Sequence, residues 1–241
     1  MATVTEHYEK HLGWYYSWLF GDFNEIVEAN RRFFTVQNLI PGKSKIAIDL
    51  GCGPGFQSIA LAQLGFSVYA FDLSRTLLDE LINNSGSLHI TPIKDDILTF
   101  SSHCPENAEL SVCMGDTLTH LDSFEKVKNL FADVYHSLET GGKFVLTFRD
   151  LVFELKGIDR FIQVKSDSET IFTCFLEYEA EHVRVNDMIY MRSKDGWKLD
   201  VSCYRKLRIP MEWVRRELLE LGFTICLYEN NKGMITVIAG K

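Results

Sequence analysis

Hydrophobic residues recur in two alternating patterns between residues 41 and 155 of this 241-residue chain. Short apolar runs predict β-strands, and apolar positions three or four residues apart predict helices between them. Strands alternating with helices indicate crossover connections, and therefore an α/β fold with a doubly wound, mostly parallel sheet. Strands are expected at 45–50, 67–71, 89–94, 110–114 and 143–148, with helices at 56–64, 75–83 and 124–138.

Residues 160–207 follow a different pattern, in which polar and apolar residues alternate with a period of two. This pattern predicts three or four antiparallel strands inserted after the fifth strand, with Asp195-Gly196 as the turn of one hairpin. Only residues 230–233 join the last two strands of the chain, so the last strand must run antiparallel to its neighbour. The α/β pattern itself returns as a helix and two strands at 211–221, 224–228 and 234–239.

Two further helices are expected near the N-terminus, at 5–20 and 24–38, and Pro41-Gly42 ends the second one. The length of the chain suits one domain with a sizeable insertion. We therefore expect a single domain over 1–241. Its parts are an N-terminal helical segment at 1–40, a seven-stranded Rossmann-like core at 41–155 and 208–241, and an antiparallel β insertion at 156–207.

The composition argues against several classes of protein. The net charge is −8 at pH 7, so the chain lacks the basic surface that nucleic acids require. No apolar run reaches the ~18 residues of a membrane span, and the start of the chain lacks the apolar core of a signal peptide. We therefore expect a cytoplasmic protein that binds neither nucleic acid nor membrane. The six cysteines form no CxxC pair, which favours reduced, mostly buried thiols over a metal site.

The stretch DLGCGPG, from Asp49 to Gly55, carries the clearest chemistry. It follows the first predicted strand, at the edge of a doubly wound sheet where ligands bind. Glycines let the backbone approach a ligand closely, and the helix that begins near Phe56 offers unpaired N–H groups. Asp72 ends the next strand, where its carboxylate can accept hydrogen bonds from both hydroxyls of a ribose. Together these features predict an adenosine site.

Two details distinguish between adenosine-containing ligands. A dinucleotide-binding GxGxxG motif needs a glycine where this chain has Phe56, and Pro54 removes one N–H donor that a pyrophosphate would use. The carboxylate of Asp49 would repel a diphosphate but suits a ligand with an ammonium group. This reasoning favours S-adenosylmethionine. A nicotinamide-dependent oxidoreductase and a non-catalytic S-adenosylmethionine-binding protein are the alternatives.

The chain resembles the class I S-adenosylmethionine-dependent methyltransferases in DLGCGPG at 49–55, FDLS at 71–74, KDDILTF at 94–100, ELSVCMGDTLTHL at 109–121 and YRKLRIPMEWVRRELLELGF at 204–223. An antiparallel last strand is also typical of this family, and its small-molecule members often carry an N-terminal helical lid and a β insertion. Asp95 competes with Asp96 for the adenine contact. The resemblance implies S-adenosyl-L-methionine as the cofactor, bound by Asp49, Gly51, Cys52, Gly53, Gly55, Asp72, Leu73, Asp96, Ile97, Met114 and Gly115.

The same resemblance implies a small organic molecule as the methyl acceptor, with the methyl group going to N or O. The acceptor cavity is expected between the N-terminal helices, the ends of the fourth and fifth strands and the insertion. Tyr15, Trp18 and Arg149 are its candidate substrate-binding residues, although aromatic residues also pack in cores and Arg149 could form a surface ion pair. Exposed apolar strand faces of the insertion would also suit a homodimer.

A general base is needed only if the acceptor must lose a proton before it attacks, as a hydroxyl does. Asp116, Tyr16 and His120 are the candidate catalytic residues. Each of them has a structural alternative, since Asp116 can cap the helix that follows, and Tyr16 and His120 can simply pack in the interior.

Overall fold

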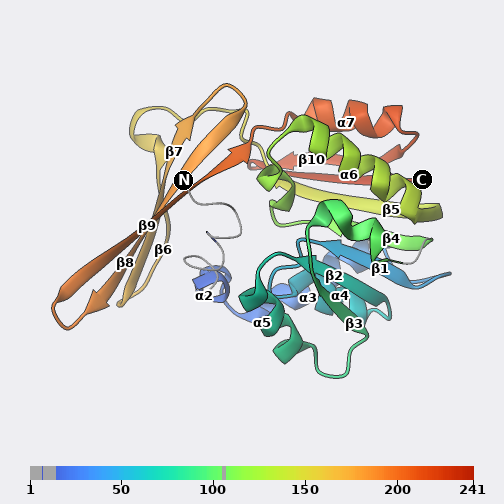
Figure 1. Cartoon of the computed structure of the whole chain (residues 1–241), viewed down its shortest axis with the longest axis horizontal. Helices are drawn as coiled ribbons and strands as arrows, with labels where there is room; N and C mark the ends of the chain where they lie inside the picture. Colours follow the sequence, from blue (N-terminus) through green and yellow to red (C-terminus); the bar gives the residue numbers. More distant parts are fainter. Residues whose placement is uncertain (1–6, 8–14, 105–106) are drawn as a thin grey trace.

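The computed structural model describes residue 7 and residues 15–104 and 107–241, arranged as Figure 1 shows. A seven-stranded sheet forms its centre, in the order β10-β11-β5-β4-β1-β2-β3. All neighbouring strands are parallel except at β11, which runs antiparallel to both β5 and β10. The prediction of a mostly parallel sheet with an antiparallel last strand is confirmed. The strands are β1 (Ile46–Leu50), β2 (Ser67–Asp72), β3 (Ile90–Lys94), β4 (Ala108–Cys113), β5 (Leu138–Arg149), β10 (Thr224–Asn231) and β11 (Met234–Gly240).

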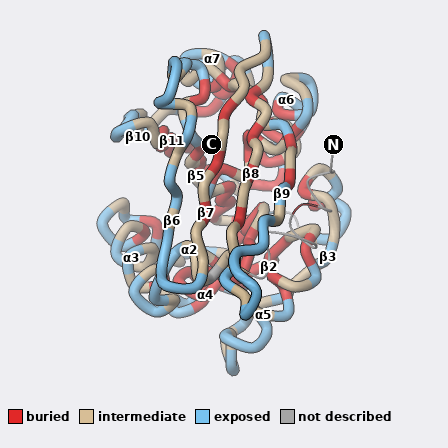
Figure 2. The backbone as a smooth tube through the Cα atoms, turned by 90° about the vertical axis from the view of Figure 1, so that its left-hand side faces the viewer, coloured by how far each residue is buried: buried red, intermediate tan, exposed pale blue. Residues whose placement is uncertain are grey.

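Helices cover both faces of this sheet (Figure 1). On β5, Phe144 and Leu146 pack into the core beneath α6 and α7, whereas Val145 between them packs into the core beneath α3 and α4. Two hydrophobic cores lie on opposite faces of the sheet, where close packing holds the strands in fixed positions. Buried segments, red in Figure 2, lie inside the molecule, and exposed segments lie at its edges. The helices are α2 (Tyr16–Phe20), α3 (Phe23–Val36), α4 (Phe56–Gln63), α5 (Arg75–Ser85), α6 (Phe124–Ser137) and α7 (Met211–Glu220), with short 3₁₀ turns η3 (Ile97–Ser102), η4 (Thr117–His120) and η5 (Gly157–Arg160).

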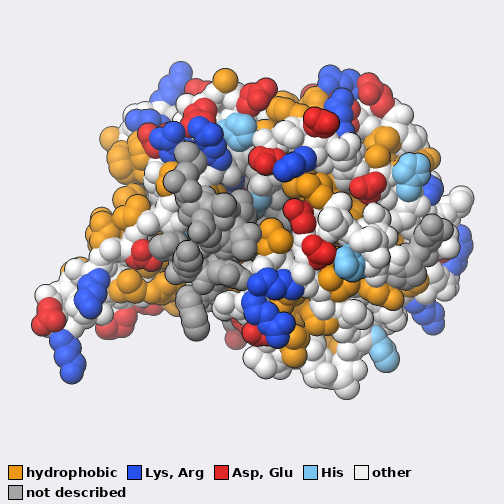
Figure 3. Space-filling view, viewed as in Figure 1, with side chains coloured by type: hydrophobic (Ala, Val, Ile, Leu, Met, Phe, Trp, Pro, Cys, Tyr) orange, Lys and Arg blue, Asp and Glu red, His pale blue; other side chains and the backbone are white. Residues whose placement is uncertain are grey.

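A second, four-stranded sheet lies beside the first, between β5 and α7 in the chain (Figure 1). Its strands are all antiparallel, which confirms the predicted β insertion. Alternate residues of β7, namely Phe172, Cys174 and Leu176, are buried on its inner face. The hairpin of β8 and β9 protrudes and carries charged side chains of both signs at its end (Figure 3). The strands are β6 (Phe161–Ser166), β7 (Thr170–Tyr178), β8 (His182–Ser193) and β9 (Gly196–Leu207).

The structure differs from the sequence prediction at several boundaries. Lys194 and Asp195 form the hairpin turn, one residue earlier than predicted, because Gly196 adopts φ +116° as the first residue of β9. β5 begins at Leu138, directly after α6, so Gly141-Gly142 lies within the strand instead of before it. Here a register shift against β4 lets Leu138 pair with Ala108.

The predicted helix at 5–20 lies largely outside the described residues, which include His7 and α2. None of the described helices has the length and apolar character needed to cross a membrane.

Candidate active site

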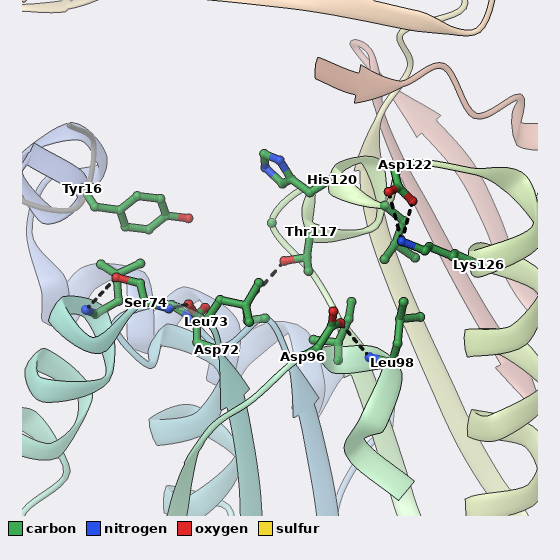
Figure 4. A pocket seen from close by; sticks show the side chains of 16 residues that line it. Tyr16, Asp72, Leu73, Ser74, Asp96, Leu98, Thr117, His120, Asp122 and Lys126 are labelled. Carbon is green, nitrogen blue, oxygen red and sulfur yellow. Dashed lines mark hydrogen bonds and ion pairs between the residues drawn. The ribbon is translucent and has the colours of Figure 1, made fainter. Parts of the chain in front are cut away.

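A cavity of about 370 Å³ opens at the carboxyl ends of the parallel strands, where the sequence predicts the ligand site (Figure 4). Its volume is typical of a site for a small molecule. The predicted site residues that line the cavity are Tyr16, Gly51, Gly53, Asp72, Leu73, Asp96, Ile97, Gly115 and His120.

The other predicted residues do not line the cavity: Asp49, Cys52, Gly55, Met114, Asp116, Tyr15, Trp18 and Arg149. Conversely, several lining residues were not predicted: Ser74, Leu77, Leu98, Thr117, Leu121, Asp122 and Lys126. Ser74, Leu98, Thr117 and Leu121 fall inside the stretches quoted above, so their position beside a predicted site residue is a usable signal. Lys126 comes from α6, and its spacing from Asp122 indicates only a surface ion pair.

The glycine loop between β1 and α4 requires glycine for two different reasons. Gly51, Gly53 and Gly55 all have positive φ, at +81°, +53° and +99°. A Cβ on Gly51 would lie 2.3 Å from Cγ2 of Thr117, and one on Gly55 would lie 2.2 Å from Cδ1 of Leu81. The loop is therefore packed tightly between α5 and the turn after β4.

Asp72 holds this loop from the end of β2. Its Oδ2 accepts a hydrogen bond from the Gly53 N–H at 2.8 Å, and its Oδ1 accepts one from the Ser74 N–H at 2.8 Å. Burial raises the pKa of Asp72, although these two N–H groups oppose the shift. Each carboxylate oxygen keeps a further lone pair, so Asp72 can also accept hydrogen bonds from a ligand in the cavity.

Asp49 lies beneath the loop and is buried. Its Oδ2 accepts a hydrogen bond from the Ser58 hydroxyl on α4, at 2.6 Å. Burial raises the pKa of Asp49 to about 7, against the lowering effect of Ser58. The sequence analysis expects Asp49 to contact an ammonium group of the ligand directly. In the structure its side chain is buried and does not line the cavity, so Asp49 can act on the site only through the glycine loop.

The opposite end of the cavity is lined by η3 and α6. Asp96 caps η3 through a 2.9 Å hydrogen bond from the Leu98 N–H to its Oδ1, and the buried Ile97 follows it. Asp95 instead pairs with His103 at 2.7 Å and does not line the cavity. Of the two neighbouring acids, Asp96 is therefore the one that faces the site.

The turn after β4 carries the candidate base Asp116. Its Oδ1 accepts hydrogen bonds from the Arg149 N–H and the Thr119 hydroxyl, both at 2.9 Å, and its Oδ2 forms an ion pair with Lys206 of β9. Burial alone would raise the pKa of Asp116, but Lys206 and the Arg149 N–H outweigh it and hold the pKa below its ordinary value. A carboxylate with these partners is a weak proton acceptor.

The other two candidate bases lie on the cavity wall, His120 near Thr117 and Tyr16 on the side of α2 (Figure 4). Burial and the negative charge of Asp72 raise the pKa of Tyr16 well above its ordinary value, so its phenol stays protonated. His120 stacks on Tyr204 of the insertion, with ring centroids 5.6 Å apart. Burial, together with the charge of Lys206, lowers the pKa of His120 to about 3, so its ring is neutral near pH 7.

Tyr15 and Trp18 connect the N-terminal helix to the insertion. Both pack with α2 against Phe172 and Ile189 on the inner face of the second sheet. The Trp18 indole N–H also donates to Asp167 at 2.6 Å. These contacts favour a bridging role for the two aromatic residues over direct contact with a ligand in the cavity.

Arg149 is exposed at the end of β5, and no described carboxylate lies within ion-pair distance of its guanidinium. Within the described residues, no three His, Cys, Asp or Glu side chains are grouped to hold a metal ion.

Comparison with known proteins identifies the class to which this fold and site belong. Residues 47–142 match the methyltransferase domain family. The glycine/sarcosine N-methyltransferase of Aphanothece halophytica is 28% identical over 196 residues, which cover 79% of this chain and 70% of that protein. An S-adenosylmethionine-dependent methyltransferase from Clostridium acetobutylicum superposes with a TM-score of 0.73 at 18% identity, covering 97% of this chain and 95% of the other.

The chain is therefore a class I S-adenosylmethionine-dependent methyltransferase, with S-adenosylmethionine as its cofactor. The structure of CalS10, an amino pentose methyltransferase from Micromonospora echinaspora solved with S-adenosylmethionine bound, has the same fold. Its TM-score is 0.71 at 14% identity, and the match covers 91% of this chain and 92% of CalS10.

Proposed function

We propose that this enzyme transfers the methyl group of S-adenosylmethionine to the nitrogen of a small amine that also carries an anionic group. The observation that carries the proposal is the environment of Asp116, which is held by Lys206, Arg149 and Thr119 and is not available as a base. Tyr16 stays protonated and His120 is only weakly basic. An unprotonated amine attacks through its own lone pair and needs no such base, whereas a hydroxyl does.

The cavity suits the cofactor on several counts. The carboxylate of Asp72 has lone pairs for the ribose hydroxyls, Asp96 can accept from the adenine amino group, and Ile97 and Leu98 give apolar walls for the ring. Gly53 lets the main chain approach the ligand without a side chain in the way. When bound, the cofactor supplies a methyl group that is already activated by its sulfonium. The protein then has to align the amine with the methyl group and exclude water.

In the transfer, the amine lone pair would form a bond to the methyl carbon as the carbon–sulfur bond breaks, and the electron pair of that bond would stay with the sulfur of the bound cofactor. The methylated amine would then release a proton to solvent. The phenol of Tyr16, which lines the cavity, can donate a hydrogen bond to the acceptor but cannot take a proton from it. We also propose that α2 and the insertion at 156–207 roof the acceptor, since α2 packs against the inner face of the second sheet and its Tyr16 lines the cavity.

Arg149 is the proposed partner of the acceptor's anionic group. Its main-chain N–H bonds to Asp116, so the residue lies beside the turn that lines the cavity, and its guanidinium has no described carboxylate partner. The relative from Aphanothece halophytica is described as acting on glycine and sarcosine, which are amines with a carboxylate. Similarity at 28% identity supports this class of acceptor for the present chain.

The test is release of S-adenosylhomocysteine with glycine, sarcosine, an amino sugar and catechol as acceptors. We expect turnover with the carboxylate-bearing amines and none with catechol. Arg149→Gln should raise the KM for glycine about tenfold or more, as expected for loss of a charged hydrogen bond. Arg192→Gln, at an exposed position of β8, is the matched control. Methylation of catechol without methylation of any amine would overturn the proposal, and cofactor binding without turnover would favour a binding protein.

A further inference from the structure

A buried ion pair joins the two sheets of the molecule. Lys206 comes from β9 of the insertion and Asp116 from the turn after β4, 90 residues earlier in the chain. Their side chains are only 14% and 7% exposed, so water screens the pair weakly. Removing one partner of such a pair leaves a buried charge without compensation.

Asp116 also sets the conformation of the turn that contains it. Its φ is +80°, a left-handed value that is uncommon for a residue other than glycine, although aspartate tolerates it better than most. The N–H of Asp116 donates to the Thr147 carbonyl at 3.2 Å, and the Gly115 N–H donates to the Thr147 hydroxyl at 2.8 Å. The carboxylate of Asp116 adds its contacts to Arg149 and Lys206, so the turn is tied to both β5 and β9.

The shape of this turn bears directly on the cofactor site. Gly115 and Thr117, on either side of Asp116, both line the cavity. Thr117 also packs against Gly51 of the glycine loop and donates from its hydroxyl to the Met114 carbonyl at 3.1 Å. A change in the turn would therefore move both the cavity wall and the support of the glycine loop.

We propose that Lys206 is a positioning residue of the cofactor site, which acts by holding Asp116 and the turn from Gly115 to Thr117 in the conformation that lines the cavity. The insertion thus contributes to the cofactor site as well as covering the acceptor. This role concerns cofactor binding and is independent of which acceptor the enzyme uses.

The charged and titratable groups around Asp116 come from several elements. Lys206 faces it from β9, His120 from η4, Tyr16 from α2 and Cys113 from β4. Of these, Lys206 is the cation that offsets the burial of the carboxylate. Without Lys206, burial would raise the pKa of Asp116. At a pH above that raised pKa, Asp116 would carry a buried negative charge with no cation beside it, which would destabilise the turn. Protonation at lower pH would relieve the uncompensated charge.

The experiment is calorimetric titration with S-adenosylhomocysteine from pH 5 to pH 8, which needs no acceptor. Lys206→Met should raise the dissociation constant about five- to tenfold at pH 8, a typical size for coupling between sites. The loss of affinity in Lys206→Met should become smaller as the pH falls towards 5, because Asp116 is then protonated. The affinity of the wild-type protein should not change with pH for this reason. Lys206→Arg should restore most of the affinity because it keeps the cation.

Arg205→Met is the matched control, since Arg205 is the neighbouring residue on the opposite face of β9 and pairs with Glu179 at 2.9 Å. We expect it to bind S-adenosylhomocysteine as wild type does. Circular dichroism verifies the fold of each variant. If Lys206→Met does not fold, Lys206→Gln keeps a hydrogen-bond donor without the charge and should show the same pH dependence. A folded Lys206→Met or Lys206→Gln protein with wild-type affinity at every pH would overturn the proposal, while failure to find an acceptor would bear only on the proposed function.

Discussion

Replacing Asp49 with asparagine should remove a pH-dependent penalty on folding. Burial raises the pKa of Asp49 from its ordinary 3.8 to about 7, so the folded protein favours the protonated carboxyl. Between pH 3.8 and about 7 the folded state holds a proton that the unfolded state has released, so the stability of the wild-type protein falls as the pH rises through this range. This contribution to stability is fully present below pH 3.8 and is lost as the pH rises through about 7.

The size of this change in stability follows from the difference between the two pKa values of Asp49. At 1.36 kcal/mol per pKa unit, a rise from 3.8 to about 7 corresponds to ~4 kcal/mol. The asparagine variant has no proton to lose but can still hydrogen-bond to the Ser58 hydroxyl. Its free energy of unfolding, relative to wild type, should therefore increase by ~4 kcal/mol between pH 4 and pH 8.

Urea unfolding at a series of pH values from 4 to 8 measures this difference. Subtracting the wild-type curve removes the contribution of carboxyl groups that do not interact with Asp49, whereas the charge of Asp72, which helps to raise the pKa of Asp49, is part of the measured effect. Asp79→Asn is the control, because Asp79 is an acid of α5 that pairs with Arg75 at a largely exposed position. The reasoning is refuted if the stability difference between Asp49→Asn and wild type stays constant from pH 4 to pH 8.

Two further predictions concern the cavity. Asp72→Asn would turn an amide N–H₂ towards the N–H of Gly53 or Ser74, so S-adenosylhomocysteine should bind at least about tenfold more weakly, as loss of a charge-assisted hydrogen bond implies; an unchanged dissociation constant in calorimetry would remove Asp72 from the site. Tyr16→Phe should lower kcat/KM but leave the shape of the pH–rate profile unchanged, because the raised pKa of Tyr16 keeps its phenol protonated. Loss of the limb in which the rate rises with pH would instead identify Tyr16 as a base, because a base must be deprotonated to act.

Part of the cavity lining could be predicted from the sequence, because those residues follow directly from strand ends. Gly51, Gly53 and Asp72 each occupy the first positions after a predicted strand, and parallel strands bring such positions to one edge. The choice between Asp95 and Asp96 needed the structure, since it depends on which acid caps η3. The placement of Asp49 also needed it, because the Ser58 hydroxyl on α4 holds that side chain beneath the loop.

The acceptor half could not be predicted in the same way. The alternation in β9 indicates that Lys206 lies on the opposite face from Arg205 but not that it reaches Asp116 in another sheet. Likewise, Tyr15 and Trp18 were identified as aromatic residues of a helix, and only the packing of α2 on Phe172 shows what they contact. Contacts between sheets depend on how the insertion is oriented, and periodicity carries no information about that orientation.

The ion pair between the sheets also determines what removal of the insertion would test. A short linker from Leu151 to Ile209 would delete the proposed acceptor roof, and a roof with no other role would leave cofactor binding unchanged. However, this deletion also removes Lys206 and leaves Asp116 without its cation. We therefore expect the trimmed protein to lose turnover and to bind S-adenosylhomocysteine more weakly, and the same deletion combined with Asp116→Asn to recover much of that binding while remaining inactive. Calorimetry after a check of folding by circular dichroism measures both, and trimmed protein that methylates glycine at the wild-type rate would show that the insertion is not part of the active site.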